Sequence, residues 1–204
     1  MNSDLYNNLA YSNHADRVNC LGKGILTFKK IIKYLEPKPG DKILEIGCNQ
    51  GKTVKKIREY SQNVIGIDVN PEAVKRAEIS DIIKMDGTKM DFPSNSFDKI
   101  YSSHTIEHIP DLNKFIREME RVLKPGGRIL LVYPLELFRG CHTLIDALYI
   151  HKNPLMMRKL HLHRLTPNKI KKLVEGTSLE HKKSKFHFVP ILSGFTLLEK
   201  KKGV

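Results

Sequence analysis

A short stretch of acidic, glycine and amide residues carries the first chemical signal in the chain. It reads Ile43-Leu44-Glu45-Ile46-Gly47-Cys48-Asn49-Gln50-Gly51-Lys52-Thr53, and Val64-Ile65-Gly66-Ile67-Asp68 follows. The order is a buried strand, a glycine turn, a helix and a strand that ends in an acid, which is how an open parallel α/β sheet holds an adenosine-containing ligand. Gly47 and Gly51 allow the turn and a close approach of the backbone. Asp68 could accept hydrogen bonds from both ribose hydroxyls.

Three kinds of ligand-binding loop compete at this turn. A dinucleotide fingerprint needs Gly-x-Gly-x-x-Gly, but Asn49 and Lys52 occupy its second and third glycine positions. A phosphate-binding loop needs four residues between its first glycine and Gly-Lys-Thr, and Gly47 leaves only three. The third pattern is Glu-x-Gly-x-x-x-Gly. Its leading carboxylate, Glu45, would repel a pyrophosphate and suits a ligand with a cationic amino or sulfonium group.

With four further segments, the chain resembles class I S-adenosylmethionine-dependent methyltransferases of the type 11 group. The likeness covers roughly Pro37 to Pro134. The segments are Glu36-Pro37-Lys38-Pro39-Gly40-Asp41, Lys84-Met85-Asp86-Gly87, Asn95-Ser96-Phe97-Asp98-Lys99-Ile100 with Ile106-Glu107-His108-Ile109, and Leu123-Lys124-Pro125-Gly126-Gly127-Arg128-Ile129-Leu130. Each is weak alone, but their order and spacing are those of the family.

The resemblance implies S-adenosylmethionine as the cofactor, with S-adenosylhomocysteine as its product. The implied cofactor-binding residues are Glu45, Gly47, Asn49, Gly51, Asp68, Val69, Asp86, Gly87 and Ser102. In the family pattern Glu45 faces the methionine end and Asp68 holds the ribose. Asp86 accepts from the adenine amino group beside the Gly87 N–H, and Ser102 contacts the methionine portion through its backbone.

The acceptor side offers three histidines as candidate bases. Methyl transfer from a sulfonium needs mainly proximity and orientation, but an oxygen or nitrogen nucleophile also needs a base. His104 follows the fourth strand at the mouth of the expected site, and imidazole titrates near neutrality. His161 and His163 lead into a Thr-Pro-capped helix, as similar histidines do in this group. We expect a catalytic base among His104, His161 and His163, although a structural role is the simpler interpretation of any one of them.

The pattern His104-x-x-Glu107-His108 raises a metal alternative. Some relatives, including quinone-biosynthesis O-methyltransferases and small-RNA 2′-O-methyltransferases, bind a divalent metal through Glu-x-x-Glu-His at this place. Here His104 replaces the first acid. Two imidazoles and a carboxylate suit zinc or a similar ion, yet Glu-His-Ile after this strand is also common in members without metal. The sequence therefore favours the absence of a metal ion at this place.

Composition bounds the partners. The 204-residue chain has a net charge of +13, which suits an anionic substrate, although a lysine-rich solvated surface is the simpler explanation. The chain has no Trp and no RNA-binding aromatic signature, so nucleic acid is a less favoured partner than a small molecule. We expect no signal peptide, no membrane span and, from three cysteines without a C-x-x-C pair, a cytoplasmic location. The oligomeric state stays open.

Hydrophobic patterns place the elements. Strands are expected at 42–46, 63–67, 81–85, 97–102, 128–133, 179–189 and 191–199, and helices at 24–35, 53–60, 112–123, 144–149, 155–160 and 168–175, with another starting at Asn70. Their alternation predicts a single-domain α/β fold, a doubly wound and mainly parallel sheet with helices on both faces and the last strand antiparallel.

Three segments of the 204-residue domain stand outside this alternation. Residues 135–164 are too long for a simple connection and are expected to form a substrate-side insertion. The resemblance implies that residues 1–21 fold over the cofactor as a lid, and the alternative is a frayed terminus. The Lys200-Lys201-Lys202 run is expected to be disordered.

The leading functional hypothesis is methyl transfer to a small molecule. Oxygen is the likelier acceptor atom, because the histidines offer a base and the fourth strand ends in Ser102-Ser103-His104-Thr105 rather than Asn-Pro-Pro-Tyr or Asp-Pro-Pro-Tyr. Net charge supports an RNA methyltransferase as the alternative within enzymes. The near-miss Gly51-Lys52-Thr53 leaves a P-loop-like nucleotide hydrolase, and a non-catalytic cofactor-binding module is the remaining possibility.

Overall fold

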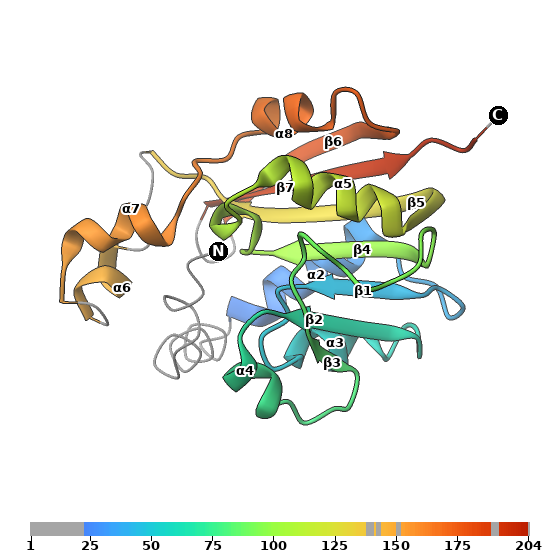
Figure 1. Ribbon diagram of the computed structural model, residues 1–204, viewed down its shortest axis with the longest axis horizontal. Helices are drawn as coiled ribbons and strands as arrows, with labels where there is room; N and C mark the ends of the chain where they lie inside the picture. Colours follow the sequence, from blue (N-terminus) through green and yellow to red (C-terminus); the bar gives the residue numbers. More distant parts are fainter. Residues whose placement is uncertain (1–22, 138–140, 142–143, 150–151, 189–191, 204) are drawn as a thin grey trace.

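The structure is a computed structural model that describes residues 23–137, 141, 144–149, 152–188 and 192–203 (Figure 1). The lid expected at 1–21 lies outside these residues. No helix among them has the length and apolarity that a membrane crossing requires.

One seven-stranded sheet organises the molecule. Its strands are β1 (Ile43–Ile46), β2 (Val64–Asp68), β3 (Ile82–Lys84), β4 (Phe97–Ser103), β5 (Leu123–Pro134), β6 (Leu179–Phe188) and β7 (Leu192–Lys200). The order across the sheet is β3-β2-β1-β4-β5-β7-β6. The pairs from β3 to β5 are parallel, whereas β7 runs antiparallel to both β5 and β6. The predicted fold class is confirmed, including the antiparallel last strand.

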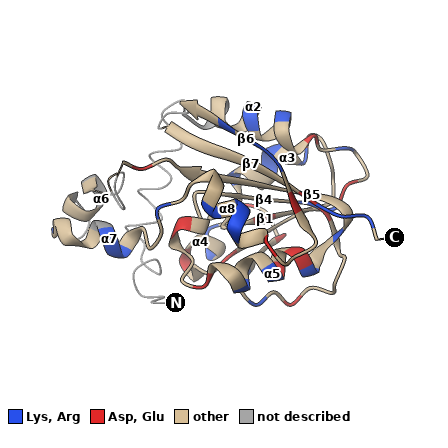
Figure 2. Ribbon diagram, turned by 90° about the horizontal axis from the view of Figure 1, so that it is seen from above, with Lys and Arg blue, Asp and Glu red and all other residues tan. Residues whose placement is uncertain are grey.

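Helices cover both faces of the sheet. They are α2 (Lys23–Leu35), α3 (Lys52–Ile57), α4 (Pro71–Lys75), α5 (Leu112–Val122), α6 (Leu144–Tyr149), α7 (Met157–Leu160) and α8 (Pro167–Val174), with single 3₁₀ turns η2 (Ile106–His108) and η4 (Pro154–Met156). The sheet lies between α2 and α3 on one side and α5 and α8 on the other (Figure 2). In Figure 1, α6 and α7 project beyond the end of the sheet where the parallel strands finish.

Alternating side chains of the strands feed two separate cores. In β1, Ile43 packs with the α2 and α3 side chains and Leu44 with those of α5 and α8, because successive residues of a strand face opposite ways. All four residues of β1 are buried, as expected of a central parallel strand covered on both faces. Strand β1 is therefore a rigid platform for the turn that follows it.

Helix α5 shows how the sequence fixes a local element. Asp111 caps it, its side chain accepting from the Lys114 N–H at 3.0 Å. Its buried residues, Leu112, Phe115, Ile116, Met119 and Val122, recur at helical spacing. The helix ends one residue earlier than predicted, because Leu123 adopts an extended conformation and already pairs with Phe97 as the first residue of β5. The predicted start of that strand at Arg128 was thus too late.

The lysine-rich tail was predicted to be disordered, and this is wrong for Lys200. Lys200 ends β7, and its Nζ donates to the Glu120 and Leu123 carbonyls, each at 2.7 Å. These carbonyls lie at the carboxyl end of α5, where backbone acceptors lack helical partners and attract a cation. The ammonium therefore joins the last strand to this helix.

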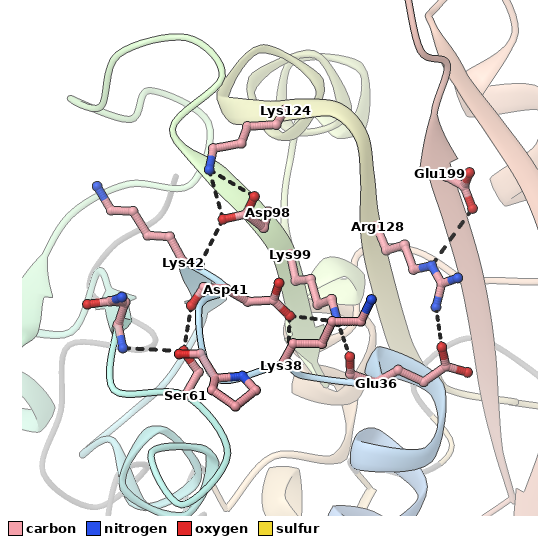
Figure 3. A network of polar contacts seen from close by, with 12 residues as sticks. Glu36, Lys38, Asp41, Lys42, Ser61, Asp98, Lys99, Lys124, Arg128 and Glu199 are labelled. Carbon is pink, nitrogen blue, oxygen red and sulfur yellow. Dashed lines mark hydrogen bonds and ion pairs between the residues drawn. The ribbon is translucent and has the colours of Figure 1, made fainter.

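A hollow among the described residues lies at the opposite end of the sheet from the predicted site. It measures about 270 Å³ and is lined by residues that precede or begin the parallel strands. Its acids are already paired (Figure 3): Asp41 with Lys99 at 2.8 Å, Asp98 with Lys124 at 2.8 Å, and Glu36 with Arg128 at 2.6 Å. We interpret this region as a structural ion-pair network.

Basic residues are spread over the molecule. Lys and Arg lie on α2 and α3 on one face of the sheet, on α8 on the other, and on α7 and the C-terminal tail (Figure 2). Nucleic-acid binding usually concentrates positive charge on one face. The distribution therefore does not add to the case for RNA.

Candidate functional site

The glycine turn after β1 has the backbone conformation that the sequence predicts. Gly47, Asn49 and Gly51 all have positive φ, at 79°, 49° and 75°. A Cβ at residue 47 would come within 2.0 Å of the Thr105 Oγ1, so glycine is needed there for space as well as for conformation. Gly51 then precedes the first turn of α3. The glycine turn therefore lies directly at the carboxyl end of β1.

Asp68 ties this turn to the neighbouring strand. Its Oδ2 accepts the Asn49 N–H at 2.7 Å, and its Oδ1 accepts the Asn70 N–H at 2.9 Å. Burial raises the pKa of Asp68, and these backbone donors oppose the rise. The adjacent Val69 is half-buried. Because β1 and β2 are parallel and in register, the turn and the carboxylate meet at one edge of the sheet.

Glu45 is a buried carboxyl that lacks a full set of partners. It pairs with Tyr101 across β1 and β4, and its Oε2 is buried without a hydrogen-bond partner among the described residues. Burial raises the pKa of Glu45 to about 8, the Asp68 charge adds to the rise, and the Tyr101 hydroxyl opposes it. A buried carboxyl that lacks a hydrogen-bond partner and lies next to the glycine turn suits a ligand with a cationic group.

This pKa predicts a pH-dependent stability that Glu45→Gln should remove. A carboxyl with a raised pKa favours the folded state when protonated, so stability is lost as pH rises from about 4.5 towards 8. The free energy of unfolding of the ligand-free wild type should fall, relative to Glu45→Gln, by roughly 3–5 kcal/mol between pH 4.5 and 9. Urea unfolding at several pH values measures this. Glu59→Gln, which changes an exposed carboxyl, should follow the wild type, and parallel profiles for Glu45→Gln and wild type would contradict the prediction.

The turn after β3 packs against the same edge. Asp86 Oδ1 accepts from both the backbone N–H and the hydroxyl of Thr88, each at 2.8 Å. Gly87 is buried so tightly that a Cβ would lie 2.8 Å from Ile46 Cγ2 and from a Phe115 ring carbon. The structure therefore brings Asp86 and Gly87 to the end of β1, beside the glycine turn.

The exit of β4 completes the edge. Ser102 is fully buried and pairs in register with Ile46. Three residues later, Thr105 Oγ1 lies 3.3 Å from the Ile46 carbonyl oxygen, to which it donates. Between them His104 has a φ of 52°, which is uncommon outside glycine and marks a backbone held in place by its surroundings. Its side chain is 35% exposed.

A cluster of imidazoles and one carboxylate lies beside His104. His104 Nδ1 is 3.5 Å and His108 Nε2 is 4.0 Å from Glu107 Oε1, both at or beyond the limit of a good hydrogen bond. Glu107 is 1% exposed, and neither of its oxygens has a hydrogen-bond partner among the described residues. Burial acts to raise the pKa of Glu107, but His104, His108 and His161 lower it to about 2. This carboxylate is therefore ionised in the interior.

The other two candidate histidines differ in their surroundings. His161 is buried and its Nδ1 donates to Glu136 Oε1 at 2.8 Å. His163 donates from Nε2 to the Ile109 carbonyl at 2.8 Å, a contact that fixes the segment before α8. The structure brings His161 into the cluster and His104 to its rim, with His163 directed to the backbone. Catalytic roles for the three remain predictions.

Sequence reasoning missed Glu136. The residue lies just after β5, and its side chain is 1% exposed. Its chain neighbours gave no motif, and its partner His161 is 25 residues further on. A single acid between apolar residues at a strand end was the one available signal, and it is common without function.

The sequence is similar to that of known methyltransferases. A model of the methyltransferase domain family matches residues 44–131. Over 117 residues the chain is 36% identical to phosphoethanolamine N-methyltransferase of Triticum aestivum, covering 53% of this chain and 23% of that protein. Over 101 residues it is 40% identical to a sterol 24-C-methyltransferase of Gibberella zeae, covering 44% and 27%. The chain thus spans about a quarter of the length of these curated relatives.

A solved structure extends the likeness to most of the chain. The S-adenosylmethionine-dependent methyltransferase of Methanosarcina mazei superposes with a TM-score of 0.65 at 23% identity, covering 85% of this chain and 98% of that one. At this identity the match shows the fold. The family range 44–131 contains the implied cofactor residues from Glu45 to Ser102 but neither Glu136 nor His161. The acceptor side therefore has to be argued from this chain alone.

Proposed function

From the premise that residues 44–131 form a class I methyltransferase domain of the type 11 group, we propose that the chain transfers a methyl group from S-adenosylmethionine to an oxygen of a small molecule. The observation that carries the proposal is the shared edge of β1, β2 and β4. There the glycine turn, the Asp68 carboxylate and the partly exposed His104 follow the carboxyl ends of three neighbouring parallel strands.

The residues of this edge fit the donor. Gly47 and Asn49 would lie against the methionine and ribose portions, and Asp68 would accept from the ribose hydroxyls. The buried Glu45 carboxyl, whose Oε2 has no partner among the described residues, would ionise beside the cationic end of the ligand, because an adjacent positive charge favours the charged form. When bound, the cofactor supplies an already activated methyl group, so the protein mainly has to position the two reactants.

The acceptor atom is assigned from His104. An acceptor hydroxyl placed between His104 and the methyl group would attack carbon with an oxygen lone pair. The C–S bond breaks with its electrons moving to sulfur, and the hydroxyl proton passes to the imidazole. The relatives' names include nitrogen and carbon acceptors, so the atom is a property to be tested on this chain.

The proposal is tested by ligand binding followed by turnover. Thermal unfolding should shift upward with S-adenosylmethionine and S-adenosylhomocysteine but not with ATP and magnesium, because only a ligand of the folded state raises the midpoint. S-adenosylhomocysteine release is then followed with panels of phenols, other hydroxyl compounds, amines and sterols. A shift with ATP alone would overturn the donor assignment, and turnover with amines alone would overturn the oxygen assignment. Binding without turnover on any acceptor would favour a non-catalytic module.

A further inference from the structure

We propose that Glu107, His108 and His161 bind a first-row divalent metal ion, with His104 at the rim of the site. The three side chains are buried, and one ligand atom from each lies within 4.8 Å of the others. The residues come from η2 after β4 and from the segment that follows α7, so the fold rather than a local motif assembles them. Two imidazoles and a carboxylate are a common ligand set for zinc and its neighbours.

The strongest reason for an ion is the carboxylate itself. Glu107 is 1% exposed, and neither oxygen has a hydrogen-bond partner among the described residues. A buried carboxyl whose two oxygens lack hydrogen bonds is costly in a folded protein, and a bound cation would satisfy both oxygens. His104 and His108 approach Oε1 only to 3.5 and 4.0 Å. The proposed cation binds between Glu107, His108 and His161.

Both imidazoles are oriented as metal ligands are. His108 Nδ1 lies 2.7 Å from the Leu160 carbonyl, which can only accept, so that nitrogen carries the proton and Nε2 is the one directed toward Glu107. His161 Nδ1 likewise donates to the buried Glu136 carboxylate. A histidine whose second nitrogen donates to a carbonyl or carboxylate is the usual support of a metal site, because the contact fixes both tautomer and ring.

The backbone holds the two halves of the cluster together. The N–H groups of Leu162 and His163 both donate to the Glu107 carbonyl, at 2.9 and 3.2 Å. The rings of His108 and His161 meet edge to face with centroids 4.9 Å apart. Bonds of 2.0–2.2 Å to a tetrahedral ion place ligand atoms about 3.4 Å apart, so a movement of about 1 Å would close the site.

The place of the site suggests its use, and this part rests on the proposed function. Thr105 links His104 to η2 and contacts the Ile46 carbonyl next to Gly47. An ion with three protein ligands keeps an open position, which an acceptor oxygen could occupy. It would orient an acceptor oxygen and favour loss of its proton.

The test uses the full chain, stripped with a chelator and titrated with Zn²⁺ and, for its visible spectrum, with Co²⁺. We expect one ion per chain and a higher unfolding midpoint with Zn²⁺. Glu107→Gln and His161→Gln should each weaken binding at least about 100-fold, whereas Glu136→Gln, which removes a supporting contact, should weaken it about 10- to 100-fold. His181→Gln is the matched control, because His181 contacts Ser184 in β6 and should leave binding unchanged.

Two results would overturn the site. One is the absence of binding to the stripped wild type at millimolar Zn²⁺. The other is wild-type affinity in both Glu107→Gln and His161→Gln. Circular dichroism and the midpoint shift with S-adenosylhomocysteine, recorded for every variant, separate a folding defect from a lost ligand. A wild type that binds zinc but no adenosyl compound would refute the proposed function and leave the metal site standing, and the reverse pattern would do the opposite.

Discussion

Replacing Asp68 with Asn is expected to raise the Kd for S-adenosylhomocysteine about 100-fold, which is about 2.7 kcal/mol. The carboxylate is proposed to accept from two ribose hydroxyls, and hydrogen bonds to a charged acceptor contribute about 1.5–3 kcal/mol each. The amide of Asn offers one accepting atom where the carboxylate offers two. It also loses one of the backbone donors that Asp68 now holds, Asn49 or Asn70. Isothermal titration with both proteins measures the change.

Asp91→Asn provides the matched control. Asp91 is exposed and lies away from the glycine turn, so the same chemical change there should leave the Kd within about twofold of wild type. Urea unfolding of Asp68→Asn tells whether a weaker Kd reflects a loosened turn. A Kd changed by less than threefold in Asp68→Asn would remove this residue from the proposed cofactor site.

Replacing Gly47 with Ala should cost about 2–5 kcal/mol of the free energy of unfolding. The added Cβ would lie 2.0 Å from Thr105 Oγ1 and 2.7 Å from its Cγ2, and overpacking of this kind costs about 1–3 kcal/mol. The φ of 79° adds about 1–2 kcal/mol for a residue with a Cβ. Urea unfolding should show a lower midpoint with an unchanged dependence on denaturant.

A double-mutant cycle separates the two causes. In a Thr105→Ala background, Gly47→Ala should recover the part due to Oγ1 and Cγ2, and retain the part due to φ and to the 2.9 Å contact with the Thr105 Cβ. Gly40→Ala is the control, because no atom lies within 4 Å of the Cβ it would add, and its effect should stay within about 0.5 kcal/mol. Equal losses in the wild-type and Thr105→Ala backgrounds would show that the turn rather than the contact with Thr105 decides the cost.

The donor half of the molecule could be predicted because its signals are local. Apolar runs ending in Glu45, Gly47 and Asp68 specify strand ends, and parallel pairing brings strand ends to one edge. Asn70 and Asp111 likewise predict helix starts, because each is an N-cap residue whose side chain accepts backbone hydrogen bonds from the first turn. Each such signal concerns a few consecutive residues, so one sequence is enough to interpret it.

What escaped prediction depends on residues far apart in the chain. The contact of Glu136 with His161 spans 25 residues, and Lys200 reaches a carbonyl 80 residues earlier. No periodicity or spacing encodes such pairs, since they exist only once β5, β7 and α5 have packed together. The metal alternative was weighed on His104, Glu107 and His108, because these three are neighbours in sequence, and His161 could not be added until the fold was known.

The two backbone hydrogen bonds from Leu162 and His163 to the Glu107 carbonyl have a thermodynamic consequence. They join the segment after α7, on the side proposed for the acceptor, to the chain that leads from Thr105 back to the glycine turn. An acceptor whose binding moves this segment and, through these bonds, the glycine turn changes the affinity for the donor. Because coupling between two equilibrium binding sites is reciprocal, the donor must change the affinity for that acceptor by the same factor.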